Sequence, residues 1–174
     1  MPSQLLRMKF QTAPKFSRYI YKMMTEFLQT VLLNESRPPL PAADGTPAPV
    51  KPKTPAETGR RQAYNQFMVA LGEAVDNAVM HGNKLNADKY IDVECEVAPD
   101  RITCHVQDQG DGFNPKRFMD APLQDFDHPA LMKKVAKYGT PGSMGIGMMR
   151  KCLNEVKFGT NDNGGTRLTM VKHL

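Results

Sequence analysis

The chain has 174 residues, of which 40% are hydrophobic, and a formal net charge of +5 at pH 7. This length fits one domain with a sizeable core. No apolar run approaches the ~20 residues that span a bilayer, and MPSQLLRMKF lacks a signal-peptide pattern. The sequence therefore predicts a cytoplasmic protein that does not enter the membrane. Residues 1–61 hold 10 Lys and Arg against 4 Asp and Glu, whereas residues 62–174 hold 13 against 14, so direct nucleic-acid binding rests only on the front third and is a minor hypothesis.

The first half of the chain predicts a strand and two helices. Residues 4–11 (QLLRMKFQ) are expected to form a short strand, and residues 15–34 carry apolar side chains at helical spacing. Residues 36–59 are rich in proline and have no periodicity, so they are expected to form an extended loop. We expect this loop to be an insertion within one domain, because neither side of it carries a complete core. A second helix is predicted over 61–82.

The second half predicts four strands and one helix. Segments 90–97 and 101–108 alternate apolar and polar residues around a short turn, which is typical of a hairpin. A long segment then reaches residue 143, followed by a helix over 145–153. The last two predicted strands are EVKFGT and TRLTMVKHL, joined through NDNGG. This order predicts a single α+β domain, a two-layer sandwich with a mixed, mostly antiparallel sheet and its helices on one face.

Three cysteines without a CxxC pair argue against a disulfide framework and are interpreted as reduced core residues. A metal site made from Cys95, Cys104 and His105 is an alternative. Because Cys104 and His105 are adjacent in a predicted strand, they should face opposite sides of the sheet, which disfavours that site.

The stretch EAVDNAVMHGN places Glu73, Asn77 and His81 at four-residue intervals, and therefore on one face of the predicted helix. A solvated edge on an ordinary amphipathic helix would explain this stripe. The same spacing also suits a polar site beside an apolar core.

Two glycine clusters are candidate ligand sites. DQGDGF puts Asp108 at the end of a predicted strand, where a carboxylate can accept a hydrogen bond from an exocyclic amine such as that of adenine. A plain turn would explain DQGDGF as well. PGSMGIGMM places glycines where a loop enters a helix, and the free amides of such a junction suit phosphates.

Taken in order, EAVDN, DQGDGF, the glycine-rich helix start and GGTRLTM resemble the GHKL (Bergerat-fold) ATPase superfamily. Within it, the chain is most similar to the bacterial anti-sigma factors that are serine kinases. The resemblance covers most of residues 4–174 and implies a Bergerat fold, with 36–59 as an insertion and 114–143 as the ATP lid. Three lid lysines, Lys133, Lys134 and Lys137, either hold phosphates or form a solvated basic face.

The resemblance also implies a role for individual residues. Glu73 matches the carboxylate that accepts or orients the proton of the attacking hydroxyl, and Asn77 matches the residue that binds the nucleotide and Mg²⁺. Asp108 matches the aspartate that reads adenine. The remaining residues expected at the nucleotide are Gly110, Gly112, Gly142, Ser143, Met144, Gly145, Ile146, Gly147 and Thr166. The expected cofactors are ATP and Mg²⁺, and structural roles are expected for His81 and Gly82.

The resemblance implies a serine/threonine protein kinase that acts as an anti-sigma factor. Such a protein phosphorylates an antagonist of the STAS type and sequesters a sigma factor, and members of this branch commonly form homodimers. The alternative is a nucleotide-binding partner switch without kinase activity, because an arginine often found before the second glycine box is missing and Pro141 stands nearby. The catalytic domain of a sensor histidine kinase is disfavoured, since the chain has no helical hairpin with a phosphoacceptor histidine.

Overall fold

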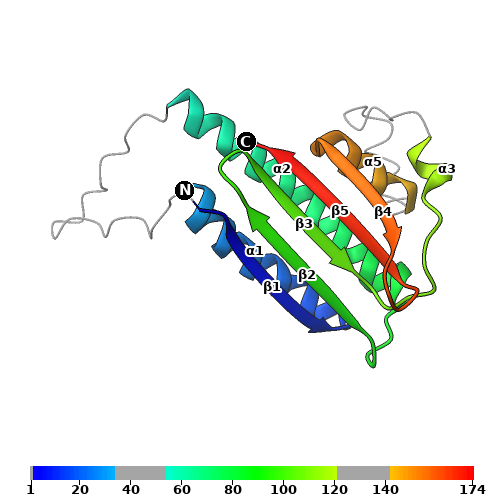
Figure 1. The fold of residues 1–174 in the computed structure, drawn as a ribbon. Coiled ribbons are helices and arrows are strands. Elements are labelled where there is room, and N and C mark those ends of the chain that lie inside the picture. The colour runs from blue at the N-terminus through cyan, green and yellow to red at the C-terminus, as the bar shows by residue number, and fades with distance from the viewer. Residues whose placement is uncertain (1, 34–53, 121–141) are drawn as a thin grey trace, which may run out of the picture.

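A computed structural model describes residues 2–33, 54–120 and 142–174. One sheet of five strands runs through the described part of the chain, in the order β1-β2-β3-β5-β4, and all four pairings are antiparallel (Figure 1). The strands are β1 (Gln4–Gln11), β2 (Tyr90–Val97), β3 (Arg101–Gln107), β4 (Glu155–Thr160) and β5 (Thr166–His173).

Helices cover one face of this sheet. Figure 1 shows α1, α2 and α5 behind the strands, with α2 in the middle of the layer. The helical segments are α1 (Pro14–Leu32), α2 (Pro55–Asn77), the π-helix η1 (Ala78–Gly82), the short α3 (Lys116–Met119) and α5 (Gly142–Cys152). The predicted α+β sandwich with helices on one face is therefore confirmed. None of the described helices is long and apolar enough to cross a membrane.

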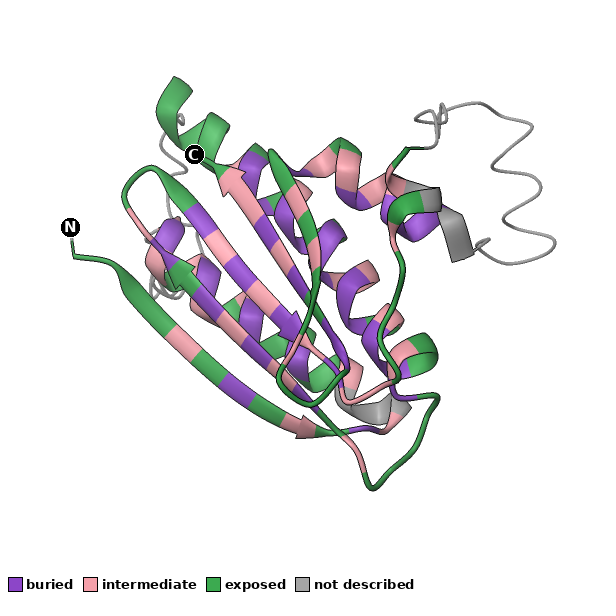
Figure 2. Cartoon of the chain, turned by 45° about the vertical axis from the view of Figure 1, so that its right-hand side comes forward, coloured by how far each residue is buried: buried purple, intermediate pink, exposed green. Residues whose placement is uncertain are grey.

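The core lies between the two layers. Along β2 and β3 every second residue is buried, as the alternating colours of Figure 2 show. Cys95 and Cys104 pair directly across these strands and are both fully buried, whereas His105 is half-buried on the opposite face. The predicted separation of Cys104 from His105 is confirmed. Among the residues that the structure describes, no cluster of three His, Cys, Asp or Glu is placed to hold a metal ion.

The start of α2 corrects one prediction. The helix begins at Pro55, so the end of the loop predicted over 36–59 is helical, six residues before the helix predicted from 61. Thr54 Oγ1 accepts a hydrogen bond from Glu57 N at 3.2 Å, and Glu57 Oε2 accepts one from Thr54 N at 2.6 Å. This capping box and a proline in the first turn are helix-start signals that the proline content of the segment concealed.

The other helix boundaries move by a few residues. The helix predicted over 61–82 is α-helical only to Asn77, and Ala78–Gly82 form a wider π turn. α5 starts at Gly142 rather than 145, so the second glycine box lies inside its first two turns. Within the predicted lid 114–143, Lys116–Met119 form a short helix. Residues 36–53 of the predicted loop and 121–141 of the predicted lid lie outside the described residues.

Candidate functional site

The end of α2 carries two polar side chains that lie against α5. Glu73 and Asn77 are both half-buried. A Cβ atom placed on Gly145 would lie 2.6 Å from Glu73 Oε2 and 3.5 Å from Asn77 Nδ2. The structure therefore brings three predicted site residues together. α5 can approach the stripe this closely because residue 145 has no side chain.

The surroundings of Glu73 make its carboxylate a stronger base than that of an exposed glutamate. Burial, and then the charge of Asp76, raise the pKa of Glu73 above its usual range. A carboxyl group that is partly removed from water and held beside a helix terminus is a chemically reasonable acceptor for a proton at neutral pH. His81, the third member of the predicted stripe, is exposed in η1 and is not part of this cluster.

Asp108 is buried at the end of β3 and is fixed by hydrogen bonds. Its backbone N–H donates to the Thr166 carbonyl at 3.1 Å, and its Oδ1 accepts from the backbone N–H groups of Gly110 (2.9 Å) and Thr166 (3.0 Å). All hydrogen bonds that the described residues donate to this carboxylate reach Oδ1. Oδ2 therefore remains as an acceptor for a ligand.

Backbone packs directly around this carboxylate. A Cβ atom on Gly82 would overlap the Asp108 carboxylate, and one on Gly110 would overlap the Gly82 carbonyl. Gly112 has a φ of +80° and approaches the Gly164 carbonyl, so a larger residue there would be strained as well as crowded. The predicted glycines Gly110 and Gly112 thus shape the surroundings of Asp108.

The turn between β4 and β5 holds Asp108 from the other side, and sequence reasoning did not identify it. Asn161 Nδ2 donates to the Asp108 carbonyl at 2.7 Å, and Asn161 Oδ1 accepts from Gly165 N at 3.0 Å. A Cβ atom on Gly165 would overlap the Asp108 carbonyl. The segment NDNGG was the available signal, because Asn and Gly favour such turns, but its contact with Asp108 is 53 residues distant in sequence.

Asn83 is a second residue that sequence reasoning missed. It follows η1, is fully buried, and accepts a hydrogen bond at Oδ1 from Gln109 N at 2.7 Å. Gln109 is the residue after Asp108, so Asn83 holds the same turn from the side of η1.

The rest of the second glycine box lies along the start of α5. Gly142 and Ser143 are in its first turn, and Gly147 is half-buried in its second. The side chains of Met144 and Ile146 are buried, so any contact that they make with a nucleotide would come from their backbone.

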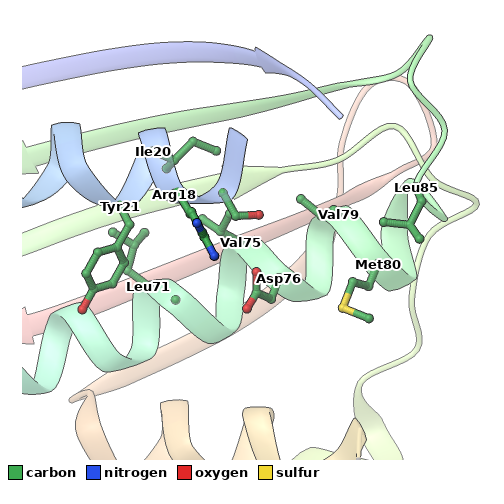
Figure 3. Close-up of a pocket in the computed structure, with 11 residues that line it drawn as sticks. Arg18, Ile20, Tyr21, Leu71, Val75, Asp76, Val79, Met80 and Leu85 are labelled. Atoms are coloured by element: carbon green, nitrogen blue, oxygen red, sulfur yellow. The ribbon is translucent and has the colours of Figure 1, made fainter. Parts of the chain in front are cut away.

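A separate hollow of about 630 Å³ lies on the other side of α2, where it faces α1. Figure 3 shows Asp76 and Met80 of the α2–η1 segment beside this hollow, with Arg18 and Tyr21 of α1 opposite. Glu73 and Asn77 do not line it. The two faces of α2 are therefore distinct, and the polar cluster at Gly145 belongs to the face toward α5.

Comparisons with known proteins give a family and several named relatives. The family model described as the histidine kinase-like ATPase domain matches residues 55–172. An anti-sigma F factor of Clostridium novyi is 29% identical over 105 residues, which are 60% of this chain and 67% of that protein. The serine-protein kinase RsbW of Bacillus velezensis is 30% identical over 106 residues, 61% of this chain and 62% of that protein, and RsbW of Bacillus subtilis is 27% identical over the same shares.

Proposed function

Because this chain belongs to the histidine kinase-like ATPase family, we propose that it is an ATP-dependent serine/threonine protein kinase that acts as an anti-sigma factor. The observation that carries the proposal is the apposition of Gly145 with Glu73 and Asn77, at the end of the helix whose π-helical continuation reaches Asp108. Glu73 lies in the last turn of α2, and Gly82, nine residues further along, ends η1. The Glu73–Asn77 cluster and the Asp108 carboxylate, which lies against Gly82, therefore suit opposite ends of one elongated ligand.

Asp108 suits the base of ATP. Its Oδ1 is occupied by two backbone N–H donors, and its Oδ2 is left to accept a hydrogen bond. The exocyclic amine of adenine is a donor, whereas guanine presents a carbonyl oxygen at the corresponding place. A buried acceptor with no described donor therefore favours adenine, since a mismatched acceptor would leave two oxygens facing each other. Thr166 supports this carboxylate through its backbone N–H, which donates to Asp108 Oδ1.

Asn77 suits Mg²⁺. The ion prefers oxygen ligands and reaches proteins through few side chains, completing its shell with water and substrate phosphates. The amide oxygen of Asn77 would be one fitting ligand for an ion held mainly by the triphosphate. When bound, Mg²⁺ would neutralise charge on the phosphates. The first turns of α5, with Gly145 and Gly147, would offer backbone amides to those phosphates.

Glu73 would accept the proton in the transfer step. The hydroxyl oxygen of the substrate serine forms a bond to the γ-phosphorus while the bond to the β-phosphate oxygen breaks, and ADP leaves with that electron pair. The hydroxyl proton passes to the Glu73 carboxylate, whose raised pKa makes it a stronger base than an exposed glutamate. Gly145 leaves room for this carboxylate to face the substrate.

The names of the relatives support the partners of this reaction. Relatives of 26–30% identity are an anti-sigma F factor and the serine-protein kinase RsbW. We propose that this chain likewise sequesters a sigma factor and phosphorylates a STAS-domain antagonist, as a cytoplasmic protein and as a homodimer. The alternative is a nucleotide-dependent partner switch that transfers no phosphate, which the missing arginine before the second glycine box favours.

Calorimetry with ATP and GTP tests the nucleotide site. In Asp108→Asn, the two backbone donors keep the amide oxygen at the Oδ1 position, so the NH₂ group takes the place of Oδ2 and faces the base as a donor. We expect Asp108→Asn to lose ATP affinity and to gain relative affinity for GTP. Asn77→Ala should lose mainly the Mg²⁺-dependent part of ATP binding. Failure of the wild type to bind ATP would overturn the proposal.

Transfer of labelled phosphate to a cognate STAS-domain protein separates the two candidate functions. The kinase proposal expects phosphoserine on that protein. Mg²⁺-dependent ATP binding without phosphoserine would assign the chain to the partner-switch class instead.

A further inference from the structure

We propose that Asn83 is a positioning residue that sets the chain's preference for adenine by fixing the turn that carries Asp108. The inference rests on the proposed function, because it concerns the base-reading end of the nucleotide site. Asn83 does not touch that ligand position itself. It acts through Gln109, the residue that follows Asp108.

Every hydrogen-bonding atom of the Asn83 amide is engaged. Oδ1 accepts from Gln109 N at 2.7 Å, and Nδ2 donates to Thr12 Oγ1 at 2.6 Å and to the Tyr90 carbonyl at 2.9 Å. Asn83 and Thr12 are both fully buried. A buried amide with all of these partners is costly to replace, and it fixes the relative positions of the segments that it joins.

Those segments meet at the base-reading end of the site. Thr12 directly follows β1, Tyr90 starts β2, and Gln109 lies two residues after the end of β3. Gln109 also accepts a hydrogen bond at Oε1 from Tyr90 N at 2.6 Å, so residues 83, 90 and 109 close a ring of contacts. The turn after Asp108 is thereby attached to the start of β2 and to Asn83, which follows η1.

The neighbours of Asn83 and Gln109 are also in close contact. Gly82 precedes Asn83 and lies against the Asp108 carboxylate, while its carbonyl lies against Gly110. The hydrogen bond from Gln109 N to Asn83 Oδ1 therefore holds two backbone segments, 82–83 and 108–110, against each other. If this bond is lost, the turn at 109–110 can shift away from Gly82, and Gly110 N, one of the two donors to Asp108 Oδ1, shifts with it. Thr166 N is then the remaining donor to the carboxylate, and Asp108 Oδ2 is held less firmly.

If Asn83 had only a structural role, its loss would lower stability without changing the ratio of ATP to GTP affinity. Loss of a buried hydrogen bond lowers stability wherever it occurs, but it changes the choice between ATP and GTP only if it moves the group that reads the base. Thr12 offers a matched control, because Thr12→Val removes a buried partner of the same amide. It leaves the bond between Asn83 Oδ1 and Gln109 N in place.

The experiment measures the ratio of ATP to GTP dissociation constants by calorimetry, at a temperature where melting curves show each variant to be folded. Asn83→Ala should reduce the preference for ATP by about fivefold to tenfold, the effect of one positioned hydrogen bond. Asn83→Ser, which is also too short to reach Gln109 N, should do the same and serves if the alanine variant does not fold. Thr12→Val keeps the acceptor for Gln109 N and should retain the preference.

The outcomes separate this inference from the proposed function. Wild-type protein without ATP binding or without a preference for ATP would remove the base-reading role of Asp108, and this inference with it. A wild type that prefers ATP, with Asn83→Ala or Asn83→Ser variants that keep the same ratio, would overturn the positioning role alone. Equal losses in Thr12→Val and Asn83→Ala would also overturn it, since the bond to Gln109 would then have no special part.

Discussion

Gly145→Ala should separate the stability of this protein from its chemistry. The added methyl group would lie 2.6 Å from Glu73 Oε2, closer than van der Waals contact allows. The neighbour is the far end of a flexible side chain, so the carboxylate can rotate away while the backbone stays. The substitution therefore displaces the proposed catalytic base and leaves the packing of the hydrophobic core unchanged.

The expected energies nearly cancel for folding. Alanine is better than glycine inside a helix by about 0.8–1 kcal/mol, and an off-rotamer Glu73 costs about 0.5–1.5 kcal/mol. The free energy of unfolding should therefore change by no more than about 1 kcal/mol. Displacing a reacting group by about 1 Å can reduce the rate about 100-fold, so phosphate transfer should fall by roughly that factor.

Gly72→Ala is the matched control. Gly72 lies in α2, one residue before Glu73, and a Cβ atom there would meet Tyr21 at an ordinary 3.8 Å. This variant should gain stability and keep wild-type transfer. Chemical denaturation and a single-turnover assay with labelled ATP measure both quantities. Transfer at the wild-type rate by Gly145→Ala would refute the reasoning that α5 and Glu73 share one site.

Three further substitutions test the structure around the site. Gly165→Ala places a Cβ atom on the Asp108 carbonyl, which is backbone and cannot rotate away, so denaturant titration should show a loss of about 1–3 kcal/mol. Phe67→Ala removes a fully buried ring, and the same titration should show a loss of about 3–5 kcal/mol. The pKa of Glu73 is raised in the folded protein, so the folded state holds the proton more tightly than the unfolded state and stability falls as pH rises above about 4.5. Glu73→Gln has no carboxyl group at this position and so does not lose stability in this way. The melting temperature of the variant minus that of wild type should therefore increase from pH 4.5 to pH 7. A difference that does not change with pH would contradict burial as the cause of the raised pKa.

Local patterns predicted most of the fold. β2 and β3 were predictable because apolar and polar residues alternate, and the structure pairs Cys95 directly with Cys104 as a hairpin requires. The start of α2 was not predicted, because Pro55 was counted with the prolines of the preceding segment rather than as the first residue of a helix. The π turn after Asn77 has no periodic signature, since it adds one residue to a single turn.

The candidate site was predictable where one residue implies its own chemistry. Glu73, Asn77 and Asp108 were identified from residue type, spacing and family resemblance. Asn83 and Asn161 were not, because their roles depend on partners 26 and 53 residues away, and only the folded chain brings them together. The pKa shift of Glu73 likewise depends on burial by neighbouring elements, which a helical pattern does not reveal.

Single-turnover transfer of the γ-phosphate to the serine of a cognate STAS-domain antagonist tests the central claim most directly. Wild type and Glu96→Gln, an exposed glutamate on β2, should both form phosphoserine. Glu73→Gln should bind ATP as wild type does and transfer phosphate at least about 100-fold more slowly. Wild-type transfer by Glu73→Gln would contradict the account, because the proton of the attacking hydroxyl would then have another acceptor.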